Sequence, residues 1–345
     1  DAIQMIILVV GILVCTGYAL SYLGGFEALQ AQVDPDRLNI LDFNWGIGEG
    51  QEFGFWPMVI GGFFLYASYY GCDQSQAQRS LSGRSLRQVQ GALMLNGLVR
   101  FPIVLCYCLM GLIVGTFAAQ TPEFMEMIPA NDPDQMMPLF IAHYLPHGIL
   151  GLLIIAILAS AMSSLSSAVN SLSAASVEDL VLRFRKKPVS EAQRLTYSKL
   201  ATVFWGVVCL LLAFVGDQIA DTIIEAINKI GSVFFGPILA TFMLAILSKR
   251  AHARAANIGL LAGVALNLYI WLGVGNGLFW IWWNFTGAMT TLTVGLLASY
   301  LIPADHIKPL PGEPREWLRW QNVVLLGYFL LMIGICSWLP GWMLG

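Results

Sequence analysis

The sequence predicts an all-α polytopic membrane protein with about nine transmembrane helices. Of its 345 residues, 57% are hydrophobic and only 11% are charged, and the mean hydropathy is +0.70. A soluble globular domain carries about 25% charged residues, so this composition excludes an ordinary water-soluble domain. The net charge of −3 is small and gives no sign of nucleic-acid binding.

Nine apolar stretches account for the predicted helices. A spanning helix needs about 20 mainly apolar residues. The stretches are residues 3–24, 55–72, 91–118, 148–169, 200–215, 223–247, 255–272, 278–301 and 323–342. The fifth is short, and the second becomes polar before a full span is complete.

The distribution of basic residues predicts the orientation. Fifteen of the eighteen Lys and Arg residues lie in the loops after the second, fourth, sixth and eighth stretches. The loop after the third stretch has none of them, but it contains Glu123, Glu126, Asp132 and Asp134. Because cytoplasmic loops collect positive charge, we expect a multi-pass protein of the cell (inner) membrane. The N-terminus of the chain would be cytoplasmic and its C-terminus outside.

A serine-rich face in the fourth stretch is the first candidate site. At about 100° per residue, five hydroxyls fall on one face roughly 100° wide. They belong to Ser160, Ser163, Ser164, Ser167 and Ser171. Small residues of this kind also line packed helix interfaces. Five hydroxyls on one stripe exceed what packing requires, so cation coordination by neutral oxygens is slightly favoured.

The second stretch contains a possible helix break. Residues 63–76 pass from apolar to polar, and Gly71 is a natural break point inside the helical run. Interrupted helices indicate a transporter binding site, which makes Tyr66, Tyr69 and Gln74 candidate gate or substrate-binding residues. The alternative, equally favoured by the spacing, is that Asp73 and Gln74 simply begin the inner loop.

Charged and polar residues inside the spans are a third feature. Arg100 lies well inside the third stretch and precedes Pro102. An intramembrane Arg indicates a functional site, although its side chain could equally reach the inner interface. Glu225 and Lys229 have the spacing of a structural ion pair on one helix. Between them, Asn228 suits a hydrogen bond to another helix.

The positions of the histidines, cysteines and tryptophans narrow the range of possible functions. All four histidines lie outside the spans or at their edges, so neither a haem pair nor a Ser–His protease can be built, and an enzyme is not expected. The six cysteines resemble small buried hydrophobes rather than a disulfide framework. Five tryptophans are expected to form an outer interfacial belt: Trp280, Trp282, Trp283, Trp338 and Trp342.

Three motifs carry a resemblance to a known family. The most specific is the run from Ser160 to Ser171 that ends in Val177-Glu178-Asp179-Leu180. The others are the run from Tyr70 to Arg79 and the opening Asp1-Ala2-Ile3-Gln4. These motifs resemble the sodium:solute symporter family, which includes the sodium–glucose, sodium–sialic acid and sodium–proline transporters. The likeness continues in order over essentially the whole chain.

The resemblance implies a LeuT-like inverted-repeat fold in truncated form. Residues 1–24 would be the last helix of the first repeat, 55–247 the five helices of the second repeat, and 255–345 three additional C-terminal helices. The chain opens with Asp1 on an apolar run, without an initiator Met or a signal peptide. We therefore expect it to be a piece of a longer protein, whose broken first helix would supply half of the binding sites.

The resemblance also implies individual roles. The Ser160 carbonyl and the hydroxyls of Ser163 and Ser164 would bind sodium, and Asp1 would form a second sodium site against the same serines. Tyr69 matches an aromatic inner gate. Arg100 stands where the sugar carriers have a sugar-contacting Lys, and Asn228 where they have a substrate-binding Gln.

The expected function is sodium-coupled symport of a small organic solute into the cell by alternating access. The expected partners are that solute, sodium ions and the lipid bilayer, with no nucleic acid. One alternative is a transport-inactive sensory or structural membrane domain of the same fold. Another is a proton-coupled carrier that uses Asp1 or Asp73.

Overall fold

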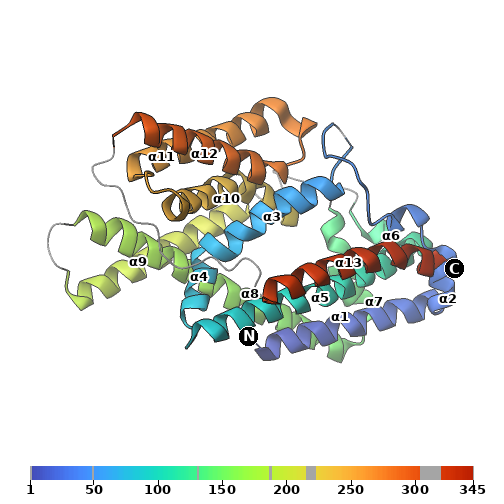
Figure 1. Cartoon of the computed structure of the whole chain (residues 1–345). Coiled ribbons are helices and arrows are strands. Elements are labelled where there is room, and N and C mark those ends of the chain that lie inside the picture. The colour runs from blue at the N-terminus through green and yellow to red at the C-terminus, as the bar shows by residue number, and fades with distance from the viewer. Residues whose placement is uncertain are drawn as a thin grey trace. The chain divides into compact units, whose positions relative to one another are not determined.

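The computed structural model describes residues 2–48, 50–129, 132–185, 189–214, 223–303 and 320–344. Within these residues every named secondary-structure element is a helix, and each of the nine predicted stretches contains one, which confirms the predicted fold class. These helices are α1 (Ala2–Leu23), α3 (Phe55–Cys72), α5 (Leu86–Gln120), α8 (His147–Ala175), α9 (Glu191–Ala213), α10 (Ile223–Leu247), α11 (Ala253–Tyr269), α12 (Trp282–Leu301) and α13 (Trp320–Leu344) (Figure 1). Short helices α2 (Phe26–Gln32), α4 (Gln74–Leu81), α6 (Pro122–Met127) and α7 (Met136–Tyr144) lie between them.

Seven of the helices in the described residues are long and apolar enough to cross a membrane. The two predicted spans outside this set are α3 and α12. Both are complete helices of 18 and 20 residues, but Gly, Ser, Thr and Tyr together make up a larger share of each than of the other seven helices. Buried polar residues such as Asn284 and Thr291 of α12 contact neighbouring helices rather than hydrocarbon, which makes a lower hydropathy tolerable.

The chain forms two compact units. Unit 1 comprises residues 1–40, 84–223 and 323–345, and unit 2 comprises residues 41–83 and 224–322. Each unit is therefore assembled from segments that are far apart in the sequence. The repeat boundaries expected from the sequence follow chain order and remain a prediction.

The core of unit 1 lies where α1 meets the C-terminal part of α5. Buried side chains of both helices pack there with an aromatic cluster formed by Phe117, Phe124, Phe140 and Tyr144. The N-terminal half of α5, by contrast, is largely exposed within the unit.

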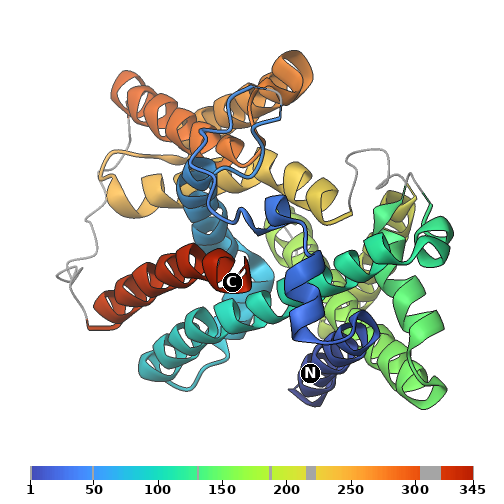
Figure 2. The same cartoon turned by 90° about the vertical axis from the view of Figure 1, so that its right-hand side faces the viewer.

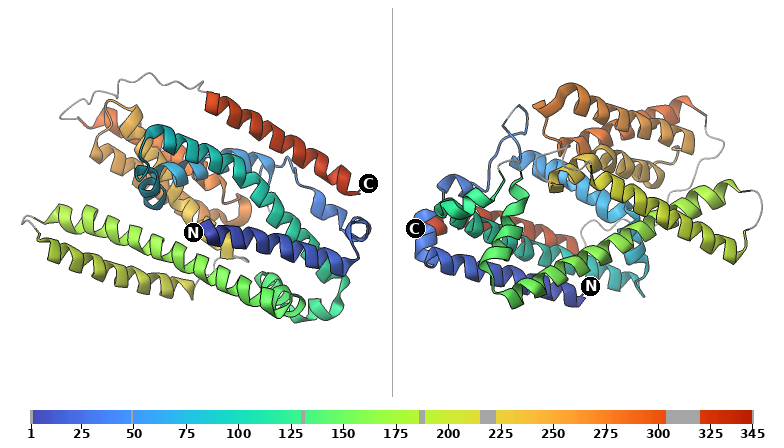
Figure 3. Two further views of the ribbon diagram at one scale, coloured as in Figure 1. Left: turned by 90° about the horizontal axis from the view of Figure 1, so that it is seen from below. Right: turned by 180° about the vertical axis from the view of Figure 1, so that it is seen from behind.

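Helices α8 and α9 form an antiparallel hairpin in unit 1 (Figure 3, left). The Ser173 hydroxyl donates to the Ser198 carbonyl at 2.8 Å, and the Trp205 indole donates to Ser176 Oγ at 2.8 Å. Near the loop that joins the two helices, Arg194 pairs with Glu178. These contacts fix α9 beside the C-terminal half of α8.

Unit 2 is built around α10, α11 and α12, with α11 and α12 drawn in orange in Figure 2. The close approach of these helices depends on glycine. A Cβ atom on Gly259 would lie 2.6 Å from the Thr291 carbonyl oxygen, and one on Gly236 would lie 2.0 Å from the Asn284 carbonyl oxygen. The Gly259-x-x-x-Gly263 spacing is thus a packing motif, as such spacings are in membranes.

Two of the tryptophans expected in an interfacial belt lie in the core of unit 2 instead. Trp283 is 1% exposed and Trp280 is 8% exposed, and both pack with Leu65, Val233 and Ile270. The belt prediction is wrong for this pair because each indole contacts neighbouring helices of its own unit. Trp338 and Trp342 are exposed and stack on one another at 5.7 Å, as a membrane-facing pair would.

Candidate functional site

The serine face of α8 is continuous in the structure. Helix α8 runs without interruption through residues 160–171, so the five hydroxyls occupy one side as expected. Leu153 and Ala156, which lie on the same side one to two turns earlier, are buried. Ser160 is half-buried and Ser164 is exposed. The serine face therefore emerges from a packed interface into accessible space.

Not all of the serines on this face are available to an ion. Ser171 is buried and its hydroxyl donates to the Ser167 carbonyl at 3.0 Å. This bond to the preceding turn is the packing role that serine often has in membrane helices. The other four serines of the face are less buried: Ser160, Ser163 and Ser167 are half-buried, and Ser164 is exposed.

Two contacts show how α1 runs beside α8. Gly11 lies against Leu153 of α8, whose Cδ2 would be 2.3 Å from a Cβ at that glycine. Tyr22, later in α1, donates from its hydroxyl at 3.1 Å to the carbonyl of Tyr144, the last residue of α7, which lies three residues before the start of α8. The later residue of α1 therefore contacts the earlier residue of the α7–α8 segment, so α1 and α8 are antiparallel. By the same spacing, the N-terminal end of α1 lies at about the level of Ser160. Asp1 itself lies outside the described residues.

The interruption expected in the second stretch exists, but at a different residue. Helix α3 continues through Gly71 to Cys72, and the break falls at Asp73, whose backbone is extended with φ −70° and ψ 127°. Asp73 Oδ1 accepts from the backbone N–H of Ser75 at 2.8 Å and from that of Gln76 at 3.3 Å. The prediction of Gly71 as the break point is wrong because a carboxylate that caps α4 ends α3 two residues later.

The structure brings the predicted gate residues of α3 together. Tyr69 packs edge-on against Tyr70 at 5.3 Å, and Tyr66 stacks on Tyr70 at 6.4 Å. Gln76 of α4 donates from Nε2 to the Tyr69 hydroxyl at 2.8 Å. The sequence prediction selected Gln74 and missed Gln76, although Gln76 is seven residues, or two helical turns, after Tyr69. Gln74, the residue that was predicted, is exposed.

Arg100 lies on α5 in unit 1 and is exposed. Helix α5 passes through Pro102 without ending. Arg100 belongs to the same unit as the α8 serines, whereas Tyr66, Tyr69 and Gln74 belong to unit 2. The predicted site residues are therefore distributed over both units.

The polar residues at the start of α10 behave differently from their prediction. The Asn228 side chain donates to the Ile224 carbonyl of its own helix at 2.7 Å, rather than to another helix. Glu225 accepts a hydrogen bond of 3.0 Å from the Trp280 indole, and no ion pair joins it to Lys229 in the described part of the chain. The ion-pair prediction is wrong because the Trp280 indole, two residues before α12, donates to the carboxylate instead.

Comparison with known proteins places these features in a family. The sequence profile of the sodium:solute symporter family matches residues 1–263. The sodium-coupled monocarboxylate transporter 1 of Homo sapiens is 31% identical over 81% of this chain and 45% of its own length. The sodium-coupled monocarboxylate transporter 2 of Danio rerio is 29% identical over 95% of this chain and 53% of its own. The human sodium/iodide cotransporter is 28% identical over 79% and 42%, respectively.

A solved structure has the same fold. The Na⁺-coupled sialic acid symporter, in a substrate-bound outward-open state, matches with a TM-score of 0.70 and 24% sequence identity, over 90% of this chain and 62% of that protein. The chain spans about half the length of the curated relatives it matches. The family profile covers most of the chain and includes both α8 and the α3–α4 break. The chain therefore belongs to the sodium:solute symporter family, whose members are membrane transporters and not enzymes.

Proposed function

We propose that the protein is a sodium-coupled symporter that carries a small organic solute into the cell by alternating access. The observation that carries this proposal is the accessible serine face of α8 at Ser160, Ser163 and Ser164. In a family of sodium:solute symporters, such a face on a membrane helix suits a weakly held alkali cation.

The proposed sodium ligands are the Ser160 carbonyl and the hydroxyls of Ser163 and Ser164. Sodium is a hard cation that prefers oxygen ligands, and neutral oxygens hold it weakly enough to be released in each transport cycle. Asp1 is proposed as a carboxylate ligand of a second sodium ion. The antiparallel arrangement of α1 and α8 supports this role, since the N-terminal end of α1 lies at about the level of Ser160.

The sodium gradient suffices to drive uptake. One positive charge crossing a potential of about 100 mV releases about 2.3 kcal/mol. A tenfold sodium gradient adds about 1.4 kcal/mol. Together these give roughly 500-fold accumulation of a neutral solute for each sodium ion. A monovalent anion that moves with one sodium ion carries no net charge across the membrane, so it is accumulated only about tenfold for that ion.

The first solutes to test are small monocarboxylates. Several relatives are named as sodium-coupled monocarboxylate transporters, and an exposed Arg100 provides a charge that suits a carboxylate. Tyr66, Tyr69 and Gln74 of α3 and α4, together with Asn228 of α10, are the other proposed gate or substrate-binding residues. The proposed orientation follows the basic loops, with residue 1 cytoplasmic and residue 345 outside.

The test is sodium-dependent uptake by the product of the complete open reading frame in proteoliposomes. Ser164→Ala should raise the sodium concentration required for half-maximal uptake by about tenfold or more, because one oxygen ligand is lost. Ser166→Ala is the matched control, since Ser166 is also exposed but lies off the serine face. Unchanged sodium dependence in Ser164→Ala would exclude this site.

The same assay separates the alternatives. A proton-coupled carrier would show uptake that follows pH and ignores sodium. A sensory or structural domain would show no uptake. The proton-coupled alternative has less support at Asp73, because its carboxylate is already engaged in capping α4.

A further inference from the structure

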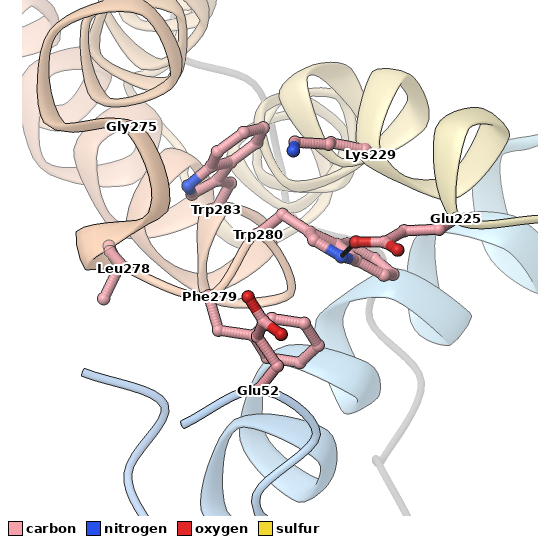
Figure 4. A pocket seen from close by; sticks show the side chains of 8 residues that line it. All are labelled: Glu52, Glu225, Lys229, Gly275, Leu278, Phe279, Trp280 and Trp283. Carbon is pink, nitrogen blue, oxygen red and sulfur yellow. Dashed lines mark hydrogen bonds between the residues drawn. The ribbon is translucent and has the colours of Figure 1, made fainter. Parts of the chain in front are cut away.

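A pocket in unit 2 combines two buried indoles with three charged side chains (Figure 4). We call it the indole pocket. Its lining comprises Glu52, Glu225, Lys229, Gly275, Leu278, Phe279, Trp280 and Trp283. The cavity volume is about 20 Å³. On the same measure one water molecule requires roughly 10–15 Å³, so the pocket has more room than a single water needs. The pocket is partly open, so a ligand larger than water can extend out of it.

The Trp283 indole is the group in this pocket that requires a ligand. Trp283 is 1% exposed, and its Nε1–H has no hydrogen-bond partner among the described residues. An unsatisfied buried donor destabilises a fold by about 1–3 kcal/mol, so such groups normally meet a ligand or an ordered water. Because an indole N–H can only donate, its partner must be an acceptor.

The unpartnered hydrogen-bond donors of the pocket, rather than its net charge, favour an anion over a cation. Lys229 is half-buried, and no contact in the described part of the chain gives its ammonium a partner. The Glu225 carboxylate, by contrast, already accepts from the Trp280 indole at 3.0 Å. Glu52 is exposed, so water screens its charge. The two polar groups left to recognise a ligand, Trp283 and Lys229, are both donors.

The backbone around the pocket is firmly held. Gly48 donates to the Gly277 carbonyl at 3.0 Å, and Phe279 donates to the Gly46 carbonyl at 2.9 Å. Phe53, next to Glu52, has a φ of 60° in the left-handed region, and its ring packs edge-on against Phe279 at 4.9 Å. A non-glycine residue in this conformation is strained, and such residues concentrate at ligand-binding sites.

We infer that the indole pocket binds a small monovalent anion, either a carboxylate or an inorganic ion. The anion accepts a hydrogen bond from Trp283 Nε1, and the charge of Lys229 attracts it. Glu225 and Glu52 weaken the binding, which keeps the anion exchangeable. If the anion is the transported solute, the pocket holds it beside Lys229, the residue that follows Asn228 in α10; this last step rests on the proposed function.

The test measures acetate binding to the purified full-length protein in sodium-free choline buffer, by saturation-transfer NMR of the acetate methyl group. Trp283→Phe keeps the ring and removes the donor, so it should raise the Kd for acetate by about tenfold. Lys229→Met should have a similar effect, and Lys229→Arg should restore binding. Trp282→Phe is the control, because that indole donates to the Trp45 carbonyl outside the pocket.

Glu225→Gln is a variant in which acetate should bind more tightly rather than more weakly. It should lower the Kd for acetate severalfold, because a negative charge disappears while an acceptor for Trp280 remains. Weaker acetate binding in this variant, or wild-type binding in Trp283→Phe, would overturn the inference. Absence of acetate binding to the wild type would mean that the pocket holds water only.

Two further arms complete the experiment. Competition by iodide would show that inorganic anions share the pocket, whereas acetate binding that iodide leaves unchanged would show preference for a carboxylate. Because binding is measured without sodium, it can fail while sodium-dependent uptake persists. Uptake can likewise be absent while acetate still binds, so the inference and the proposed function are tested separately.

Discussion

The side-chain amide of Asn267 in α11 donates a hydrogen bond of 3.0 Å to the carbonyl of Val233 in α10. In an uninterrupted helix this carbonyl would accept from the backbone N–H of residue 237. That residue is Pro237, which has no N–H. Asn267 therefore replaces the donor that the proline removes.

A second pair in unit 1 repeats this arrangement. Pro102 in α5 leaves the Leu98 carbonyl without its intrahelical donor. The Tyr328 hydroxyl of α13 donates to that carbonyl at 2.6 Å, and α13 lies beside α5 in Figures 1 and 2. Prolines are tolerated in membrane helices where a neighbour satisfies the freed carbonyl. Both donors come from helices that follow α10 in the chain.

The first prediction concerns Asn267. This residue is fully buried and also donates to the Trp283 carbonyl at 2.9 Å. We expect Asn267→Leu to lower the free energy of unfolding by about 2–3 kcal/mol, since buried acceptors lose their donor. Detergent-induced unfolding of the purified protein measures this change.

The matched background for this test is Pro237→Ala, which gives Val233 a backbone donor again. In that background Asn267→Leu should cost about 1 kcal/mol less than in the wild type. An identical cost in both backgrounds would show that Asn267 acts only through its other bonds.

The second prediction concerns Tyr328. Tyr328→Phe removes the hydroxyl but keeps the edge-on contact with Phe101 at 6.4 Å. We expect the free energy of unfolding to fall by about 1–2 kcal/mol, because the Leu98 carbonyl is left unsatisfied at membrane depth. The same unfolding assay applies. With Pro102→Ala as the background the loss should nearly vanish, and a full loss there would contradict the role assigned to this hydroxyl.

The sequence was sufficient to locate the helices because hydropathy is a local property. Each of the nine apolar stretches contains a helix, and the serine face of α8 follows directly from helical spacing. The donors for the freed carbonyls could not be found in this way. Tyr328 and Leu98 are 230 residues apart, and no periodicity connects them.

The predictions from the sequence were wrong at positions where a single other side chain determines the local structure. Gly71 is permissive enough to end a helix, but the Asp73 carboxylate, which can cap the next helix, determines where α3 stops. Similarly, the spacing of Glu225 and Lys229 suits an ion pair, yet a tryptophan 55 residues further along the chain takes the carboxylate. The spacing of residues along the chain shows which helix ends and ion pairs are possible, and contacts elsewhere in the fold determine which of them form.

The third prediction separates a capping role for Asp73 from a proton-carrying role. Helix α4 has only eight residues, too few to be stable without an N-terminal cap. Asp73→Ala should therefore destabilise α4 by about 1 kcal/mol, and hydrogen exchange at the amides of Ser75 and Gln76 should accelerate accordingly. The bond from Gln76 to the Tyr69 hydroxyl starts in the same turn, so uptake should fall as well.

Asp73→Asn is the decisive comparison, because asparagine caps helices about as well as aspartate but cannot carry a proton. If Asp73 is a cap, this variant keeps both the slow exchange at Ser75 and Gln76 and the sodium-dependent uptake. If Asp73 carries a proton, the variant keeps slow exchange but loses uptake. In the first case both the stability of α4 and the transport activity are retained. In the second case the stability of α4 is retained and the transport activity is lost. The capping geometry of 2.8 Å to the Ser75 N–H and 3.3 Å to the Gln76 N–H favours the first outcome, since both bonds go to backbone donors of α4 that asparagine can also satisfy.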